Sequence, residues 1–459
     1  MERETGVHAP TVAEFAADLR AGATSAQRLA TACLERIADP AGVGARTYVA
    51  VDRDKVLAQA QASDMLRRHG IVPSPLAGIP VSLKDLFDVA GEVTRAASKI
   101  LADRPPAERD APAIARLRAA GAVFIGRTNM TEFAYSGIGI NPHHGTPSSP
   151  WDRATGRVPG GSSSGAAVSV ADGMAMLAIG TDTGGSCRIP AALCGVVGFK
   201  PTASRISREG VFPLARSFDS IGPIGRSVAC VALADAIMAG EDYEPPIAGS
   251  PARLRLAIPQ TLVLDGLDET VARAFEAAVR TLRDQGAAID EIALADLAEL
   301  PTLIQHGGIA GAEILAVHRP LLKSHAAEYD PRVRARIELA AALSGADYVD
   351  LLARRTALIA RFTKSAASYD ALILPTVPIV APPFSAFEQD DDYFRLNRTL
   401  LRNPGCFNML DGCAITLPCH HVDEAPVGLM LASSHGRDRA LFGIAATVEA
   451  ALRPVRGQA

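Results

Sequence analysis

Three short stretches of the chain gather residue types that can do chemistry. They span residues 78–85, 159–165 and 180–190. The first ends on Lys84-Asp85, the second contains Ser162 and the third contains Ser186. A serine hydroxyl is a useful nucleophile only when a neighbouring base takes its proton. Histidine is absent from all three stretches, so a triad built on histidine has no obvious base and Lys84 is the available one.

A lysine can act as a base only when it is neutral. The apolar run Val81 to Leu83 is expected to remove water from Lys84 and to lower its pKa from ~10.4 toward neutrality. A second serine hydroxyl can accept and donate at once, so it can relay a proton between base and nucleophile. The alternative for Lys84 is a surface pair with Asp85, and the two serine stretches argue against it.

Together these stretches resemble the amidase signature family, whose hallmark is a Gly/Ser-rich segment, here Gly160 to Pro190. Ser162 and Ser186 are 24 residues apart, which is the spacing of the family's two signature serines. The resemblance covers about 11–448 and is weakest between 241 and 372. Its further matches lie at 127–133, 198–202, 210–214, 219–223, 407–408 and 426–429.

The resemblance implies an amidohydrolase that cleaves an amide-like C–N bond in an amide, anilide or carbamate. In that scheme Ser186 forms an acyl-enzyme, Ser162 relays the proton from a cis-peptide turn, and Lys84 is the general base. The turn that leads to Ser186 can also direct successive backbone N–H groups at one point, as an oxyanion hole requires. Its expected members are Thr183, Gly184, Gly185 and Ser186. No cofactor is implied.

Substrate contacts are expected from four residues near the signature. These are Met130, Tyr135, Gly161 and Ser163. The apolar residues nearby favour a small neutral substrate, such as an aryl amide or aryl carbamate. An acidic substrate would need a facing arginine, which Arg205 or Arg208 could supply.

Other residues of the signature are expected to be structural. Arg188 is expected to hold the signature loop, and Asp182 and Thr181 are expected to cap or brace it. Cys187 follows the proposed nucleophile, but no histidine lies near it to act as its base, so we expect an inert thiol.

Two other kinds of site fit the sequence less well. Residues 161–165 match the G-x-S-x-G pattern of a nucleophile elbow, but residues 152–157 before them do not form a strand. The neighbouring pairs His143-His144 and His420-His421 point their side chains apart, so each pair offers at most one ligand per site. We therefore expect no metal.

Composition sets the broad class. The 459 residues carry a net charge of −4 without a basic face, so nucleic acid is not an expected partner. Seven cysteines without a CxxC motif favour a reducing compartment. Residues 1–10 lack a signal sequence, and no apolar run reaches ~18 residues. We expect a cytoplasmic enzyme with a small-molecule substrate and no membrane partner, as a monomer or homodimer.

Short apolar strands alternating with helices must position the three stretches. This pattern predicts an α/β fold over residues 1–459: one large α/β/α domain with a mixed, twisted sheet flanked by helices. Residues 75–225 are the expected signature core, and 241–370 a more variable helical region covering the substrate pocket. Helices are predicted over 11–20, 25–37, 53–69 and 111–120, and strands over 81–84, 122–125, 194–199 and 372–375, with 168–178 mixed.

Two rival functions remain open. The first is the glutaminase component of a tRNA amidotransferase complex, although the glutamine-site sequence typical of such proteins is not found after Pro223. The second is a catalytically silent binding protein on the same scaffold, which the intact Lys84, Ser162 and Ser186 argue against.

Overall fold

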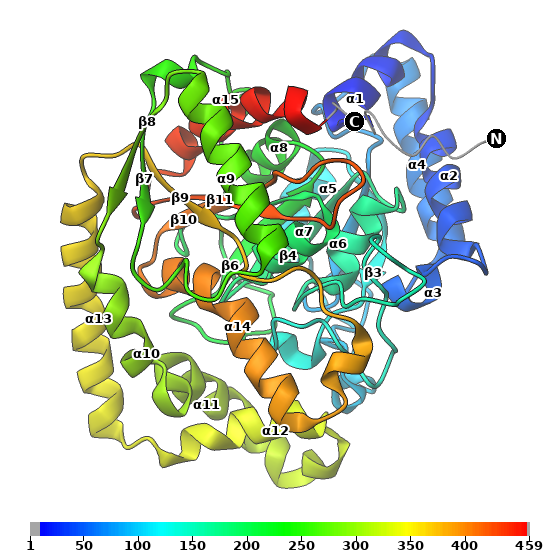
Figure 1. Ribbon diagram of the computed structural model, residues 1–459. Coiled ribbons are helices and arrows are strands. Elements are labelled where there is room, and N and C mark those ends of the chain that lie inside the picture. Colours follow the sequence, from blue (N-terminus) through cyan, green and yellow to red (C-terminus); the bar gives the residue numbers. More distant parts are fainter. Residues whose placement is uncertain (1–9, 457–459) are drawn as a thin grey trace.

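The structure is a computed structural model that describes residues 10–456, and it is built around one large mixed sheet (Figure 1). The eleven strands lie in the order β1-β3-β2-β4-β6-β5-β10-β11-β9-β7-β8. Strand β2 is parallel to both β3 and β4, and β7 is parallel to β8 and β9, whereas the remaining pairs are antiparallel. The expected α/β domain with a mixed sheet flanked by helices is confirmed.

The strands are short, as the sequence indicates. Their bounds are β1 Tyr48–Ala50, β2 Pro80–Lys84, β3 Val123–Thr128, β4 Leu177–Asp182, β5 Val197–Lys200, β6 Ser220–Gly225, β7 Arg255–Pro259, β8 Ala288–Ile292, β9 Ala371–Pro375, β10 Cys413–Pro418 and β11 Gly428–Ser433. The strand predicted over 194–199 begins three residues later, because Cys194 ends helix α7 and Gly195 follows it with φ 71°. No range was predicted for β1, β6, β7, β8, β10 or β11. Of these, β8 lies at the sheet edge and is largely exposed, so it has no apolar pattern to detect.

In the first third of the chain, the helices that were predicted begin and end close to their predicted positions. The bounds of all helices of the described chain are α1 Val12–Ala21, α2 Ala26–Ala38, α3 Gly44–Thr47, α4 Arg53–Arg68, α5 Pro112–Ala119, α6 Ser164–Ala171, α7 Arg188–Cys194, α8 Val228–Ala239, α9 Glu269–Asp284, α10 Leu300–Leu303, α11 Gly308–His325, α12 Pro331–Glu338, α13 Gly345–Ala366, α14 Asp390–Met409 and α15 Asp438–Arg456. The segment predicted as mixed, 168–178, holds the end of α6 and the start of β4.

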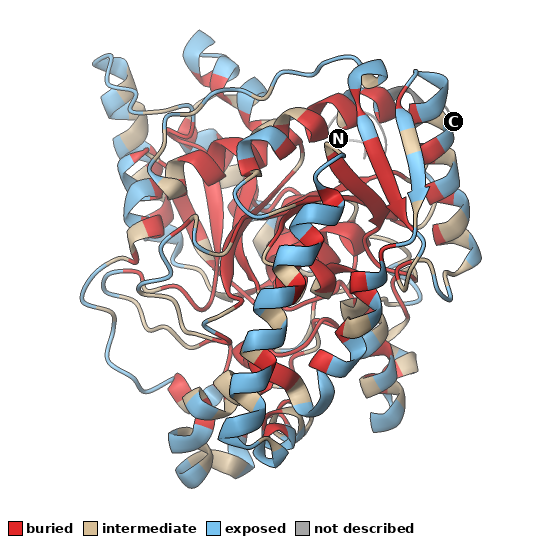
Figure 2. Ribbon diagram, turned by 90° about the vertical axis from the view of Figure 1, so that its left-hand side faces the viewer, coloured by how far each residue is buried: buried red, intermediate tan, exposed pale blue. Residues whose placement is uncertain are grey.

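Each face of the sheet is covered by its own helices. In β5, Val197 and Phe199 pack into a core with α8, α9 and α15, whereas Gly198 between them faces α7. Ala178 of β4 packs with α6 and α7 on that second face. Successive side chains of a strand point to opposite faces, so a strand buried on both sides contacts helices on both. Figure 2 shows the buried strands between layers of helices whose outer surfaces are exposed.

The helices α10 to α13 form a separate group beside the sheet, at the lower left of Figure 1. Hydrogen bonds join this group to the signature core: Glu313 accepts the Ser217 N–H at 2.9 Å, and Glu132 accepts the Asp330 N–H at 2.7 Å. Its role as a cover over a substrate pocket stays a prediction.

None of the helices in residues 10–456 is long and apolar enough to cross a membrane. The expectation that no signal sequence opens the chain concerns residues 1–10, of which only Pro10 is among those described.

Candidate active site

The site begins where two parallel neighbours of the sheet end. Strands β2 and β4 pair in parallel, with Leu83 opposite Ile179, so their carboxyl ends meet at one edge of the sheet. Lys84 is the last residue of β2, and Thr181 lies one residue before the end of β4. The apolar residues of both strands are buried, which places the lysine ammonium in an environment from which water is excluded.

Lys84 contacts both a serine and a threonine hydroxyl. Its Nζ lies 2.8 Å from Ser162 Oγ and 2.9 Å from Thr181 Oγ1, and the residue has no exposed surface. Burial lowers the pKa of Lys84 to about 8, although the nearby Cys187, Asp182 and Asp219 oppose this shift. The surface pair with Asp85 does not form. That carboxylate is buried beside Arg127, 3.4 Å away.

Ser162 lies in the loop that leads into α6. The peptide bond between Gly161 and Ser162 is cis, as the resemblance implies. The loop is fixed from outside: the Gly161 N–H donates to the Gly137 carbonyl at 2.8 Å, and the Gly137 N–H donates to Asn397 Oδ1 at 2.8 Å. Helix α14, which supplies Asn397, thus supports the loop that carries Ser162.

Ser186 lies in the turn between β4 and α7, with 4% of its surface exposed. The Ser163 N–H donates to the Ser186 carbonyl at 3.3 Å, which holds the two serine loops side by side. The Ser186 hydroxyl forms no hydrogen bond with any residue in 10–456, so its oxygen is uncommitted. Lys84 and Ser186, which are separated in the sequence by two strands and two α-helices, thus come to the same edge of the sheet.

A buried ion pair braces the Ser186 turn. Arg188 donates to both oxygens of Asp182, at 3.1 and 2.9 Å, and neither residue is exposed. Burial alone would raise the pKa of Asp182, but the Arg188 guanidinium holds it well below its usual range. Arg188 also donates to Asn408 Oδ1 of α14 at 2.7 Å and to the Pro404 carbonyl at 2.9 Å. The structural roles expected for Arg188 and Asp182 agree with this geometry.

Replacing Arg188 by methionine is expected to destabilise the fold by about 3–5 kcal/mol, because Asp182 would be left buried without its cation. Urea unfolding of the variant and the wild type measures this difference. The exposed Arg28→Ala is a matched control, expected to change the free energy of unfolding by less than about 0.5 kcal/mol. A loss below about 1 kcal/mol for Arg188→Met would contradict the bracing role.

One N–H group of the expected oxyanion hole already has a partner within the protein, and the oxyanion hole itself stays a prediction. The Gly185 N–H donates to Asp182 Oδ1 at 2.8 Å, and the Cys187 N–H donates to Oδ2 at 3.1 Å, so Gly185 is occupied in holding the turn. Within residues 10–456, the N–H groups of Thr183, Gly184 and Ser186 have no hydrogen-bond acceptor. These three remain the candidates for binding an oxyanion.

Gly185 is nevertheless required as a glycine. Its φ is 129°, a conformation that other residues rarely adopt, and an added Cβ would lie 2.6 Å from Pro404 Cγ. Glycine is therefore needed at this position for the backbone conformation of the turn.

The residues expected to touch substrate are largely buried and have contacts within the protein. Met130 and Ser163 have no exposed surface, and the Ser163 hydroxyl donates to the Thr181 carbonyl at 3.3 Å. Tyr135 is mostly buried, with the Arg336 guanidinium 3.9 Å from its ring centre. The substrate contacts of Met130, Tyr135, Gly161 and Ser163 stay a prediction.

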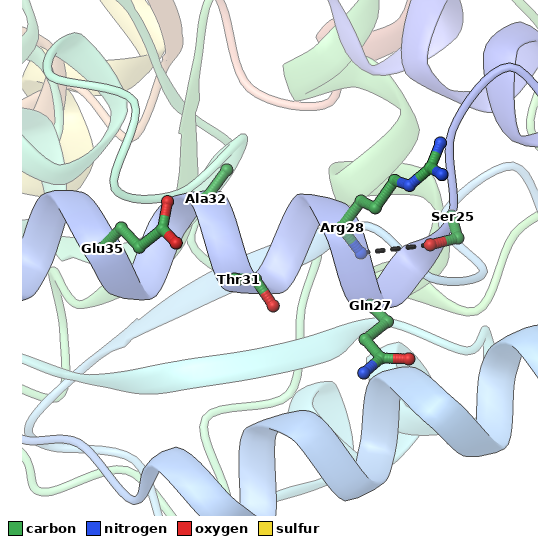
Figure 3. Close-up of a pocket in the computed structure, with 6 residues that line it drawn as sticks. All are labelled: Ser25, Gln27, Arg28, Thr31, Ala32 and Glu35. Atoms are coloured by element: carbon green, nitrogen blue, oxygen red, sulfur yellow. Dashed lines mark hydrogen bonds between the residues drawn. The ribbon is translucent and has the colours of Figure 1, made fainter.

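Of the two candidate arginines, one is already paired. Arg205 forms ion pairs with Asp235 and Glu241, each at 2.8 Å. Arg208 instead lines a cavity of about 520 Å³ that also touches Thr181 and Asp219. A second pocket lies on the surface of α2 (Figure 3). It is lined only by residues of that helix and its N-cap, including Ser25 and Arg28, and by none of the signature.

Two residues contribute more than the sequence indicated. Thr181 was expected only to brace the loop, yet its hydroxyl contacts the lysine ammonium. Asn408 donates to Asp182 Oδ1 at 2.9 Å from more than two hundred residues away. A hydroxyl residue ending an apolar strand was the available signal for Thr181. Asn408 had only its match to the family pattern.

Cysteine and histidine side chains near the site are accounted for by other contacts. Burial raises the pKa of the Cys187 thiol, whose Sγ lies 3.4 Å from the Gly222 carbonyl, which agrees with an inert thiol. His143 Nε2 lies 2.8 Å from Glu132, and His420 Nδ1 accepts the Val427 N–H at 3.2 Å. In the part of the chain that the structure describes, no group of three or more His, Cys, Asp or Glu side chains is arranged to hold a metal ion.

Comparison with known proteins gives a consistent result. The model of the Amidase family matches residues 28–442. A 2-amino-5-chloromuconic acid deaminase of Comamonas testosteroni is 36% identical over 96% of each chain. A glutamyl-tRNA(Gln) amidotransferase subunit of Chloroflexus aggregans is 36% identical over 93% of each chain. A crystal structure of an amidase, 33% identical, superimposes with a TM-score of 0.86 over 96% of this chain and all of that one.

Proposed function

The chain belongs to the amidase signature family of enzymes, which hydrolyse C–N amide bonds, and from this premise we propose that Ser186, Ser162 and Lys84 carry the reaction. The observation that supports this assignment best is the 2.8 Å hydrogen bond between Lys84 Nζ and Ser162 Oγ in a site without exposed lysine surface. In this arrangement the buried amine of Lys84 can act as the base, and Ser162 can relay a proton to it from the neighbouring loop that carries Ser186.

In the proposed acylation step, Ser186 Oγ attacks the substrate carbonyl carbon while its proton passes to Ser162, whose own proton passes to neutral Lys84. The negative charge on the carbonyl oxygen is bound by the N–H groups of Thr183, Gly184 and Ser186. The C–N bond then breaks, and the proton returns from Lys84 through Ser162 to the leaving nitrogen.

Water then attacks the acyl-enzyme along the same path and releases the acid. The first part of this path, from Lys84 to Ser162, coincides with a hydrogen bond of the resting enzyme. The second part, from Ser162 to Ser186, is supported by the bond that joins the two loops at Ser163. The substrates that these residues could hydrolyse include amides, anilides and carbamates, because the proposed oxyanion hole binds only the carbonyl oxygen that all three share.

A fluorophosphonate probe tests the nucleophile directly. The probe should add one label to the protein, located by peptide mapping on Ser186, because only an activated serine attacks phosphorus rapidly. Ser186→Ala should remain unlabelled, whereas Ser324→Ala, a change at an exposed serine of α11, should label like the wild type. A label on Cys187, or no label at all, would overturn the assignment and favour a silent scaffold.

The rate is expected to depend on pH through one ionisation. Only neutral Lys84 can accept a proton, and burial lowers its pKa to about 8, so kcat/KM should rise as the pH increases through about 8 and then level off. Three titratable groups act on Lys84. Asp182 stays ionised and Cys187 stays protonated near pH 8, because the pKa of Asp182 is held below its usual range and burial raises that of Cys187. Burial also raises the pKa of the third group, Asp219. A profile highest near pH 5 would instead point to a carboxylate base, and Asp182 would be the first to test.

A second candidate function follows from the similarity to the glutamyl-tRNA(Gln) amidotransferase protein, which extends over 93% of this chain. In that case the same triad would release ammonia from glutamine inside a complex. Purification from its native host, followed by a glutaminase assay, separates the two functions. A stably bound second protein together with glutamine hydrolysis would favour the amidotransferase role.

A further inference from the structure

A cavity of about 520 Å³ lies beside Thr181, near the end of β4. Ser220, at the start of β6, also lines it. Arg208 and Arg216, both exposed, contribute to its lining from the segment before β6. The cavity is thus large enough for a small organic group, and its solvent-exposed residues, which we call its mouth, include two arginines.

Two walls of this cavity touch the proposed catalytic machinery. Thr181 Oγ1 accepts from Lys84 Nζ at 2.9 Å. Asp219 Oδ1 accepts the Thr183 hydroxyl at 2.6 Å, and Thr183 belongs to the turn that is expected to bind the oxyanion. In the proposed mechanism the leaving nitrogen receives its proton from Ser162, and Lys84 Nζ contacts both Ser162 and the cavity residue Thr181. The cavity is therefore the space next to the catalytic residues into which the amine part of a substrate can extend.

The acidic groups of the cavity are already neutralised by local partners. Asp219 accepts the N–H groups of Leu214 and Ala215 in addition to the Thr183 hydroxyl. Glu209 is paired with Arg109 at 2.7 Å. Glu209 therefore has its counterion outside the cavity, and Asp219 is influenced by the charge of Arg208 without forming an ion pair with it.

The two arginines form no ion pair with a carboxylate in residues 10–456, although the charge of Arg208 acts on Asp219. Arg208 donates one Nη to the backbone carbonyls of Arg216 and Asp219, which leaves its other donors free. The Arg216 guanidinium forms no ion pair within the same residues. A guanidinium presents paired N–H donors that match the two oxygens of a carboxylate, so an anionic group at this mouth would be bound selectively.

We propose that this cavity receives the amine part of the substrate and that Arg208 and Arg216 bind a carboxylate carried on it. This inference rests on the proposed function of the triad and differs from the neutral substrate that the sequence favours. Hydrolysis then adds water across the C–N bond and yields a carboxylic acid from the acyl side and an amine that carries its own carboxylate. The substrate class is an N-acylated amino acid or aminobenzoate.

Three anilides test where a carboxylate is accepted: acetanilide is neutral, 4-acetamidobenzoate carries the charge on the amine side, and N-phenylsuccinamate carries it on the acyl side. For the wild type, kcat/KM should be at least about tenfold higher for 4-acetamidobenzoate than for acetanilide. The advantage should disappear in Arg208→Ala/Arg216→Ala, so that the ratio of kcat/KM for 4-acetamidobenzoate to that for acetanilide falls to about one. A preference for acetanilide or for N-phenylsuccinamate would overturn the proposal.

A binding measurement needs no turnover and separates this proposal from that of the triad. Calorimetry should show that 4-aminobenzoate binds the wild type at least about tenfold more tightly than aniline, and that Arg208→Ala/Arg216→Ala removes the difference. Arg28→Ala, an exposed arginine on α2, is the matched control and should retain it. Ser186→Ala should keep this binding even though it loses turnover, so loss of the triad and loss of the anion site give different results. Equal binding of the two amines, or no binding of 4-aminobenzoate, would overturn the anion site.

Discussion

Ser186→Ala is expected to lower kcat by roughly five to six orders of magnitude, because alanine cannot form the acyl-enzyme through which the proposed reaction passes. What remains should be the catalysis that the backbone N–H groups of the turn give to a direct attack by water. Burst and steady-state assays with the best substrate of an amide, anilide and carbamate panel measure the loss. A rate near that of the wild type would disprove the covalent mechanism.

The same substitution should leave the fold intact, which makes the result interpretable. The Ser186 hydroxyl donates to and accepts from no residue in 10–456, so its removal leaves no buried partner unsatisfied. The turn is held instead by its backbone, through Asp182 and Arg188. The free energy of unfolding should therefore change by less than about 1 kcal/mol, and the variant should still bind substrates and products.

The two serine loops are held in different ways, but both depend on helix α14. Arg188 reaches from the start of α7 to both Asp182 and helix α14, and all of these contacts are buried. Ser162 depends on a chain of backbone bonds that ends at Asn397, also on α14. Helix α14 thus supports both serine loops from one side, and a shift of this helix would move both loops together.

The sequence is sufficient to predict the three residues that we propose to react, but not the residues that support them. Lys84, Ser162 and Ser186 stand out because rare residue types meet at defined spacing, and each lies within a local pattern of apolar or glycine-rich residues. Thr181 and Asn408 carry weaker signals, a hydroxyl residue near the end of an apolar strand and a match to the family pattern, because their importance comes from partners that only the folded sheet brings near. Gly185 shows the opposite case. Its residue type is explained by the turn, but the direction of its N–H depends on the Asp182 side chain.

The fold follows the same division between local and long-range causes. Helices α1, α2 and α4 have amphipathic patterns and capping residues at their starts, so they were predicted to within one or two residues. Strand β8 has few buried residues and is defined mainly by pairing with β7. The order of the eleven strands is set by contacts between segments far apart in the chain, which local pattern cannot give.

Lys84→Met is expected to lower kcat/KM by roughly three to four orders of magnitude, because it removes the general base and keeps most of the side-chain volume. The loss should come with a second change that a structural role would not produce: the rise of the rate through about pH 8 should vanish.

The fold should be retained. Methionine leaves the Ser162 and Thr181 hydroxyls without the Lys84 partner, but it also removes the desolvation cost that a charged lysine without exposed surface carries. Lys200→Met is the matched control. Lys200 is equally buried, but its Nζ donates to the Pro201 carbonyl rather than to a catalytic serine, so this variant should keep the pH dependence of the wild type. If Lys84→Met kept the rise near pH 8, or if Lys200→Met lost it, the base would have to be assigned to another residue.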